Sequence, residues 1–138
     1  LHTNDAVGAV PRLMDLGVPD YLITATVDGI LAQRLVRRIC QVCTTEYEPP
    51  PEQVSQVAGQ PVGHIRLVRG TGCTACRQTG YRGRIGIFEL LIMSDAIKDV
   101  ISRSHGALSR GALQEAVSQD GMQPMRADGW AKVQAGLT

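Results

Sequence analysis

The sequence predicts an α+β fold that is mainly helical and carries a small β element stapled by zinc. Three observations support this prediction. Apolar residues recur at helical spacing towards both ends of the chain, the middle alternates polar with apolar residues between glycine-rich turns, and four cysteines form two Cys-x-x-Cys pairs. The length of 138 residues is that of a single domain, large enough to bury a hydrophobic core.

The first thirty residues predict two helices. The first helix has a cap at Asn4 or Asp5 and a left-handed stop at Gly17, with apolar residues at helical spacing between them. Pro11 conflicts with a continuous helix, because it removes a backbone donor, and should bend or shorten it. The second helix covers residues 19–27, since a proline at its start suits the first helical turn.

The middle of the chain predicts short strands around an irregular segment. Residues 31–40 alternate as a strand does, and residues 65–68 and 84–92 predict two further strands. Residues 44–63 hold three consecutive prolines and several glutamines, so we expect a surface excursion without regular structure there.

The last third of the chain predicts three helices. Ser94 or Asp95 caps the first, and Ser109 caps the second, which stops at Gly121. A third helix follows over residues 125–137, which hold the only tryptophan.

The four cysteines predict one metal site. Their spacing is Cys40-x2-Cys43-x29-Cys73-x2-Cys76, and two residues between thiolates let a turn aim both sulfurs at one point. Four thiolates leave no open coordination position, so the expected metal is a structural zinc. Iron in a tetrathiolate site, two disulfides and two redox-active pairs remain alternatives.

The charge distribution is uneven although the net charge is only +1. Residues 31–86 contain eight arginines, three glutamates and no lysine. Arginine clusters suit phosphate or carboxylate recognition, while a solvated face with internal ion pairs is the plainer alternative. No stretch approaches the roughly 18 apolar residues of a membrane span, and no export signal opens the chain, so we expect a cytoplasmic fragment.

Three blocks of sequence carry a resemblance to a known family. The segments LHTNDAVGAVPRLMDLGV, LAQRLVRRIC and GCTACRQTGYRGRIGIFELL resemble, in that order, the C-terminal part of type II secretion assembly ATPases, the GspE/PulE family, which is related to type IV pilus assembly motors. The resemblance covers nearly the whole chain. It implies the C-terminal part of a RecA-like P-loop ATPase domain, with the four cysteines as the tetracysteine metal element of the assembly branch.

The resemblance also implies a domain organisation and a nucleotide site. Residues 1–39 would end the ATPase core, residues 40–83 would form the zinc-binding subdomain, and residues 84–138 would add a strand and a helical subdomain. His2 would lie in the family's histidine box, near the terminal phosphate of ATP, and Gln33 and Arg34 would support the nucleotide core.

The implied whole protein is a homo-hexameric motor that uses ATP and Mg²⁺ at the cytoplasmic face of the bacterial inner membrane. It would drive pseudopilus assembly through an inner-membrane platform protein and a cytoplasmic recruiter, with peripheral membrane association through those partners and no nucleic acid. The chain departs from the family pattern in having no G-x-x-x-x-G-K-[ST] sequence. We therefore expect the P-loop upstream of Leu1 and the fragment alone to be inactive.

A second function from a different class stays open. The four cysteines and the arginine-rich middle are also typical of a zinc-ribbon module that binds nucleic acid or a protein partner. Only Tyr47 and Tyr81 offer aromatic platforms in the middle third, which is few for stacking bases.

Overall fold

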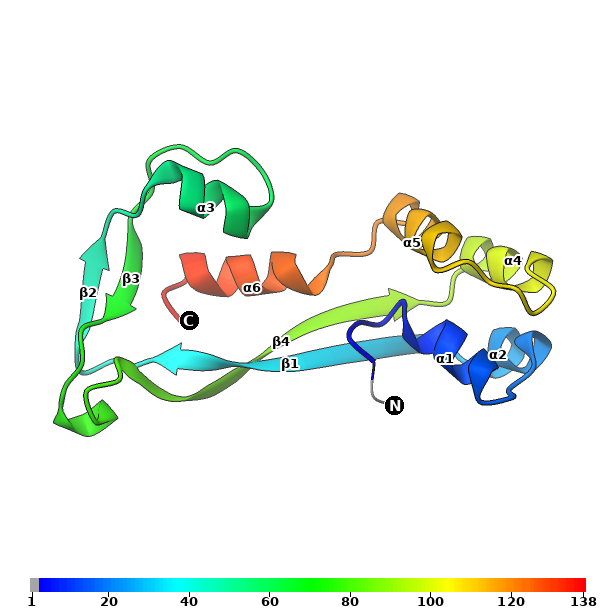
Figure 1. The fold of residues 1–138 in the computed structure, drawn as a ribbon, viewed down its shortest axis with the longest axis horizontal. Coiled ribbons are helices and arrows are strands. Elements are labelled where there is room, and N and C mark those ends of the chain that lie inside the picture. Colours follow the sequence, from blue (N-terminus) through cyan, green and yellow to red (C-terminus); the bar gives the residue numbers. More distant parts are fainter. Residues whose placement is uncertain (1–2) are drawn as a thin grey trace. The chain divides into compact units, whose positions relative to one another are not determined.

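The computed structural model describes residues 3–138, which form an α+β fold (Figure 1). In chain order the elements of this described part are α1 (Ala9–Asp15), α2 (Asp20–Thr26), β1 (Gly29–Ile39), β2 (Thr44–Tyr47), α3 (Pro51–Ala58), β3 (Leu67–Gly70), the 3₁₀ helix η1 (Thr74–Cys76), β4 (Tyr81–Ile92), α4 (Asp95–Arg103), α5 (Arg110–Gln119) and α6 (Met125–Gln134). The predicted α+β class is confirmed. Among these residues, none of the helices combines the length and the apolar character that crossing a bilayer requires.

The chain divides into two compact units, each made from two stretches of sequence. Unit 1 holds residues 1–33 and 88–124, and unit 2 holds residues 34–87 and 125–138. The long strands β1 and β4 pair with each other and contribute to both units. The Met93 N–H donates to Asp28 at one end of this pair and the Cys40 N–H donates to Gly80 at the other, so the two strands are antiparallel.

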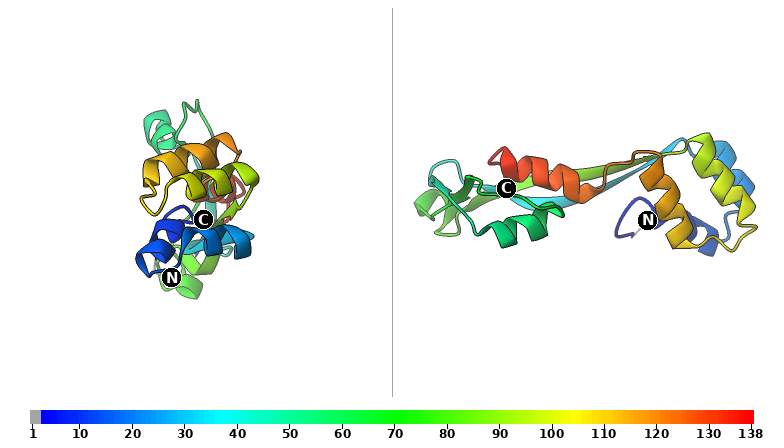
Figure 2. Two further views of the ribbon diagram at one scale, coloured as in Figure 1. Left: turned by 90° about the vertical axis from the view of Figure 1, so that its right-hand side faces the viewer. Right: turned by 90° about the horizontal axis from the view of Figure 1, so that it is seen from above.

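Unit 1 is a helical cluster packed on one face of a strand pair. Helix α4 packs against both α2 and α5 (Figure 2). Leu91 near the end of β4 and Met93 just after it are buried in this core, while Leu90 and Ile92 alternate to the outside and are 50% and 61% exposed. The buried core residues are Ala6, Val7, Val10, Ile23, Leu91, Met93, Ile97, Ile101, Leu113 and Val117.

The helix ends of unit 1 follow the sequence signals in part. Gly8, and not Asn4 or Asp5, precedes α1, and Ser109 precedes α5 without a capping hydrogen bond from its side chain. Helix α1 begins only at Ala9, so Pro11 lies in its first turn, where a missing N–H costs nothing because no intrahelical acceptor exists there. Gly17 takes a positive φ of 86° after the helix, as predicted. Ser94 caps α4, since its hydroxyl accepts from the Ile97 N–H at 3.4 Å.

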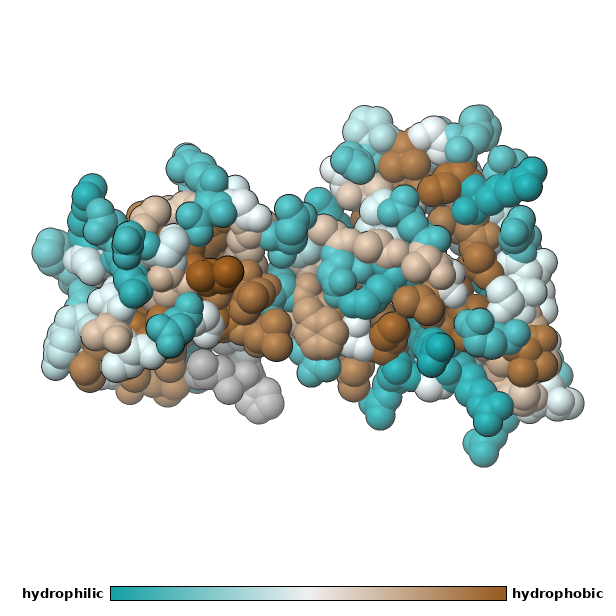
Figure 3. Space-filling model, turned by 180° about the vertical axis from the view of Figure 1, so that it is seen from behind, coloured by the Kyte–Doolittle hydropathy of each residue, from teal (hydrophilic) through white to brown (hydrophobic). Residues whose placement is uncertain are grey.

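Unit 2 contains the antiparallel pair β2–β3, in which Thr44 lies opposite Gly70 and Tyr47 opposite Leu67. Helix α6 packs against both α3 and β3. Hydrophobic side chains reach the surface in both units, as the space-filling view shows (Figure 3).

The predicted irregular excursion over residues 44–63 is wrong in part, because it contains β2 and α3. Pro51 stands in the first turn of α3, where proline's fixed φ favours a helix start. Gly59 ends the helix with a φ of 73°, and Val54 is only 3% exposed. The run of prolines therefore marks a helix N-terminus, and the helix is kept by burial of its apolar side.

Candidate metal centre

The four cysteines of unit 2 come from two turns that the strands bring together. Cys40 directly follows β1 and Cys43 directly precedes β2. Cys73 precedes η1 and Cys76 is its last residue. Each Cys-x-x-Cys pair is therefore local, and the chain returns through β3 to place the second pair beside the first.

Three of the six separations between the sulfur atoms match the edge of a tetrahedral zinc site. The Sγ–Sγ distances are 3.9 Å for Cys40–Cys73, 3.8 Å for Cys43–Cys76 and 3.7 Å for Cys73–Cys76, and all four atoms lie within 4.8 Å of one another. A Zn–S bond of about 2.3 Å gives a tetrahedron with edges of about 3.8 Å. All four thiols are free, so the site fits a metal rather than disulfides.

Backbone N–H groups point at two of the sulfurs. The Gly72 N–H donates to Cys43 Sγ at 3.3 Å. The Cys73 and Gly80 N–H groups donate to Cys76 Sγ at 3.1 Å and 3.3 Å. Such donors favour the thiolate form and fix the direction of the sulfur lone pairs, as outer-shell contacts do around metals.

The two sulfurs of the facing Cys43–Cys76 pair differ in acidity. Burial raises the pKa of Cys43 to about 11, together with contacts to the other thiols and against the donor from Gly72. Burial acts the same way on Cys76, but there the Cys73 and Gly80 N–H groups and the neighbouring thiols outweigh it and lower its pKa to about 6. Cys76 is thus the thiol that is prepared as a metal ligand near neutral pH.

Two glycines let the backbone close around the site. A Cβ added to Gly70 would lie 2.0 Å from the carbonyl oxygen of Gly80, and one added to Gly80 would lie 2.4 Å from the carbonyl oxygen of Gly70. Arg77 and Gln78 both adopt a positive φ, 55° and 63°, which is uncommon for residues with side chains. The turn after η1 is thus held in an unusual conformation that aims the Gly80 N–H at Cys76.

The other predicted site residues are placed as follows. Gln33 and Arg34 lie in β1 with exposed side chains. His2 lies outside the described residues. The proposed nucleotide roles of all three stay predictions.

Several arginines of the basic middle segment have partners within the chain. The Arg37 guanidinium stacks 4.1 Å from the centre of the Tyr81 ring, and that of Arg69 lies 4.8 Å from the Tyr47 ring. Arg66 lies 4.0 Å from Glu46 in an exposed ion pair. The two tyrosines considered as base-stacking platforms are therefore each faced by an arginine of the same unit.

Sequence comparisons confirm the resemblance. A family model described as "Type II/IV secretion system protein" matches residues 1–138. The chain is 41% identical over 138 residues to the type II secretion system ATPase E of Vibrio cholerae and 42% identical over 138 residues to the type II secretion system protein HxcR of Pseudomonas aeruginosa. It is 39% identical over 140 residues to the type IV pilus assembly ATPase PilB of Thermus thermophilus.

Each of these matches covers 100% of the chain but only part of the relative. The chain covers 27% of the Vibrio protein, 25% of HxcR and 15% of the Thermus protein. A match along the whole chain at this identity establishes the family without establishing the activity of a longer protein. The chain belongs to the type II/IV secretion system protein family.

Proposed function

We propose that this chain is part of an ATPase that powers type II secretion by assembling a pseudopilus, and that its four cysteines hold one structural zinc. The observation that carries the proposal is the set of sulfurs at tetrahedral spacing in a chain that matches secretion and pilus assembly ATPases along its whole length. Four thiolates would satisfy zinc completely, so its role would be to fix the fold of this turn.

The outward face of the strands in unit 1 supports a place within a larger ATPase core. Leu31, Leu90 and Ile92 are 63%, 50% and 61% exposed, and in β4 the exposed side chains alternate with buried ones. An apolar strand face of this kind is normally covered by another layer. We propose that residues 1–39 end a RecA-like core, that residues 40–83 form its zinc subdomain, and that residues 84–138 complete it.

In this proposal, ATP hydrolysis needs residues of a longer protein in addition to these 138. The P-loop would lie upstream of Leu1, and the 138 residues alone would be inactive. His2 would sense the terminal phosphate of ATP bound with Mg²⁺, and Gln33 and Arg34 would support the nucleotide core. The whole protein would act as a hexamer at the cytoplasmic face of the inner membrane, through a membrane platform protein and a cytoplasmic recruiter.

The cysteine turns would act as a rigid arm that passes nucleotide-driven motion to the secretion platform. The arm would be stiff because both Cys-x-x-Cys turns are tied by backbone hydrogen bonds, among them Thr71 N–H to Cys43 and Cys40 N–H to Gly80, both at 2.9 Å. A closed tetrathiolate site has no position for a substrate, which favours this mechanical role over a catalytic one.

The test is Cys73→Ser in the protein produced from its complete gene. We expect secretion to be abolished while the basal ATPase rate of folded, oligomeric protein falls by only about threefold or less, because the arm transmits motion and does not touch ATP. Ala75→Ser is the matched control, since Ala75 is exposed in the same turn and offers no ligand. A folded Cys73→Ser protein that secretes normally would refute the arm.

A further inference from the structure

Glu89 is the one buried charged residue among residues 3–138, with 7% of its surface exposed. It occupies an inward position of β4, in register with the core residues Leu91 and Met93. A carboxylate at such a position is costly unless it is hydrogen-bonded. The buried carboxylate of Glu89 therefore needs a hydrogen-bond donor that offsets the loss of its hydration.

That partner is the backbone of the segment before α1. The Ala6 N–H donates to Glu89 Oε1 at 2.6 Å, and Ala6 itself is fully buried. Ionised acceptors make short hydrogen bonds that are stronger than neutral ones. The bond joins residues 83 positions apart, so it fixes where this segment crosses the strand.

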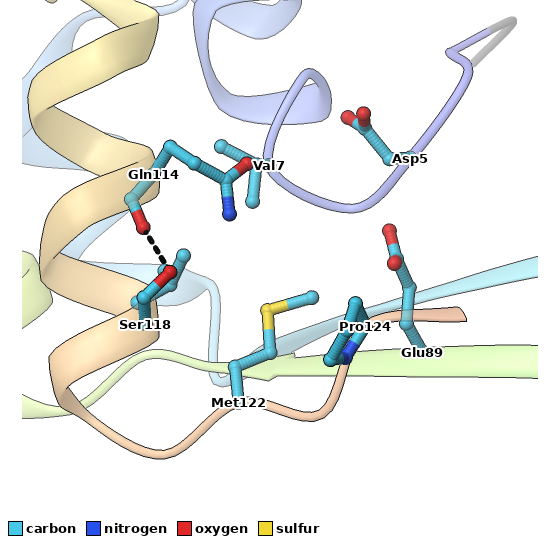
Figure 4. A pocket seen from close by; sticks show the side chains of 8 residues that line it. Asp5, Val7, Glu89, Gln114, Ser118, Met122 and Pro124 are labelled. Atoms are coloured by element: carbon cyan, nitrogen blue, oxygen red, sulfur yellow. Dashed lines mark hydrogen bonds between the residues drawn. The ribbon is translucent and has the colours of Figure 1, made fainter. Parts of the chain in front are cut away.

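A second contact ties the same segment to α5. Asp5 accepts from the Gly8 N–H at 2.8 Å and pairs with the guanidinium of Arg110, the first residue of α5. Figure 4 shows the carboxylates of Asp5 and Glu89 beside one cavity of about 210 Å³, with Gln114 on its other side. Residues 5–8 are thus held from β4 and from α5 at once.

The held segment leads directly to His2. Ala6 lies four residues after the histidine, and four residues span at most about 14 Å. The hydrogen bond from the Ala6 amide to Glu89 therefore holds the chain at a point only four residues after His2 in the sequence.

Resting on the proposed function of His2, we propose that Glu89 is a positioning residue of the ATPase, which holds the histidine-bearing segment in place through the Ala6 amide, with Arg110 as its support through Asp5. Glu89 needs no contact with nucleotide in this role.

The experiment uses Glu89→Leu in the protein produced from its complete gene. Leucine fills a similar space but leaves the Ala6 N–H without its acceptor. We expect kcat to fall about tenfold with KM for ATP changed by less than about twofold, since the misplaced histidine acts on the bound nucleotide. Glu89→Gln keeps a carbonyl acceptor and should recover kcat to within about threefold of the unchanged protein.

A double-mutant cycle with His2→Ala separates positioning from general damage. If Glu89 acts through the histidine, Glu89→Leu lowers kcat no further in the His2→Ala background. If the reductions in kcat caused by Glu89→Leu and His2→Ala multiply in the double variant, the positioning role of Glu89 is overturned, whereas the proposed role of His2 is not. A His2→Ala protein with normal kcat would overturn the proposed role of the histidine and the inference with it.

Two further variants control for folding. Leu91→Ala removes an inward side chain from the same strand face without touching the Ala6 amide, and an equal fall in kcat at the same loss of thermal stability would contradict the inference. The second variant is Arg110→Ala, which removes the ion pair with Asp5 near the surface. The Arg110 side chain is 57% exposed and the Asp5 side chain 28%. It should lower kcat by about twofold to threefold, and only when His2 is present.

Discussion

The thiols of Cys43 and Cys76, whose sulfurs lie 3.8 Å apart, differ in pKa because burial, backbone donors and the neighbouring thiols act differently on the two sulfurs. Cys76 receives two N–H donors, from Cys73 and Gly80, whereas Cys43 receives one. Donors stabilise the thiolate and burial opposes it, so the balance lowers the pKa of Cys76 to about 6 and raises the pKa of Cys43 to about 11.

This difference predicts a break in the pH dependence of zinc affinity. Above about pH 6 the metal-free Cys76 is already a thiolate and releases no proton on binding, whereas below its pKa it must lose one. Cys43, with a pKa of about 11, must lose its proton throughout this range. The slope of log Kd against pH should therefore steepen by about one proton per zinc as the pH falls through 6.

Competition titrations with a coloured chelator between pH 5 and 8 would measure that slope. A constant slope over the whole range would show that the Cys73 and Gly80 donors do not prepare Cys76 as predicted.

The cluster of four cysteines could be predicted from the sequence, but the buried position of Glu89 could not. Two residues between cysteines is a local signal that a turn translates directly into geometry. Glu89 stands in the run IFELL, where alternation alone does not reveal which face is buried. Its partner Ala6 is 83 residues away, and only the fold brings the two together.

At the scale of elements, the glycines near the cysteines differ in what they permit. Gly70 and Gly80 approach so closely that any side chain would collide with backbone, which cannot move aside cheaply. Gly63, in the same unit, has no atom within 4 Å of an added Cβ and no positive φ. The close backbone approach is therefore specific to Gly70, at the end of β3, and Gly80, and is not shared by Gly63.

Gly70→Ala should destabilise the zinc-loaded protein by about 3 kcal/mol and weaken zinc binding, because the strand end must shift. Gly63→Ala should change the free energy of unfolding by less than about 0.5 kcal/mol. Urea denaturation of both variants measures this difference. Equal stability of the Gly70→Ala and Gly63→Ala variants would contradict the close backbone approach of Gly70 and Gly80.

The helix caps offer a second test at this scale. Ser94 accepts a hydrogen bond from the Ile97 N–H, whereas the Ser109 side chain makes no capping bond although it occupies the same position before α5. Ser94→Ala should cost about 1 kcal/mol of unfolding free energy and Ser109→Ala only a few tenths. Thermal denaturation of the two variants measures the difference, and the reverse order would contradict the capping geometry.

The sequence predicts most elements but misjudges α3. Capping residues, glycine stops and apolar spacing are local, so α2, α4, α5 and α6 are close to their predicted positions. Helix α3 was obscured because three prolines and several glutamines are typical of loops. Its stability depends on Val54, which is buried by contacts that the local pattern does not contain.

At the scale of the whole molecule, each compact unit is built from two separate stretches of chain. Strands β1 and β4 pair with each other, and each contributes residues to both units. Local sequence signals mark only contiguous segments, whereas these units are discontinuous. The predicted domain boundaries at residues 39 and 83 therefore stay predictions. Family membership rests on a match along all 138 residues.

The metal content of the protein tests whether its four cysteines bind one structural zinc. Native mass spectrometry of the purified 138-residue chain should find one zinc per chain, and a chelator should remove the metal and lower the melting temperature together. A chain that contains no metal, or that keeps its melting temperature after the metal is removed, would contradict the structural zinc site.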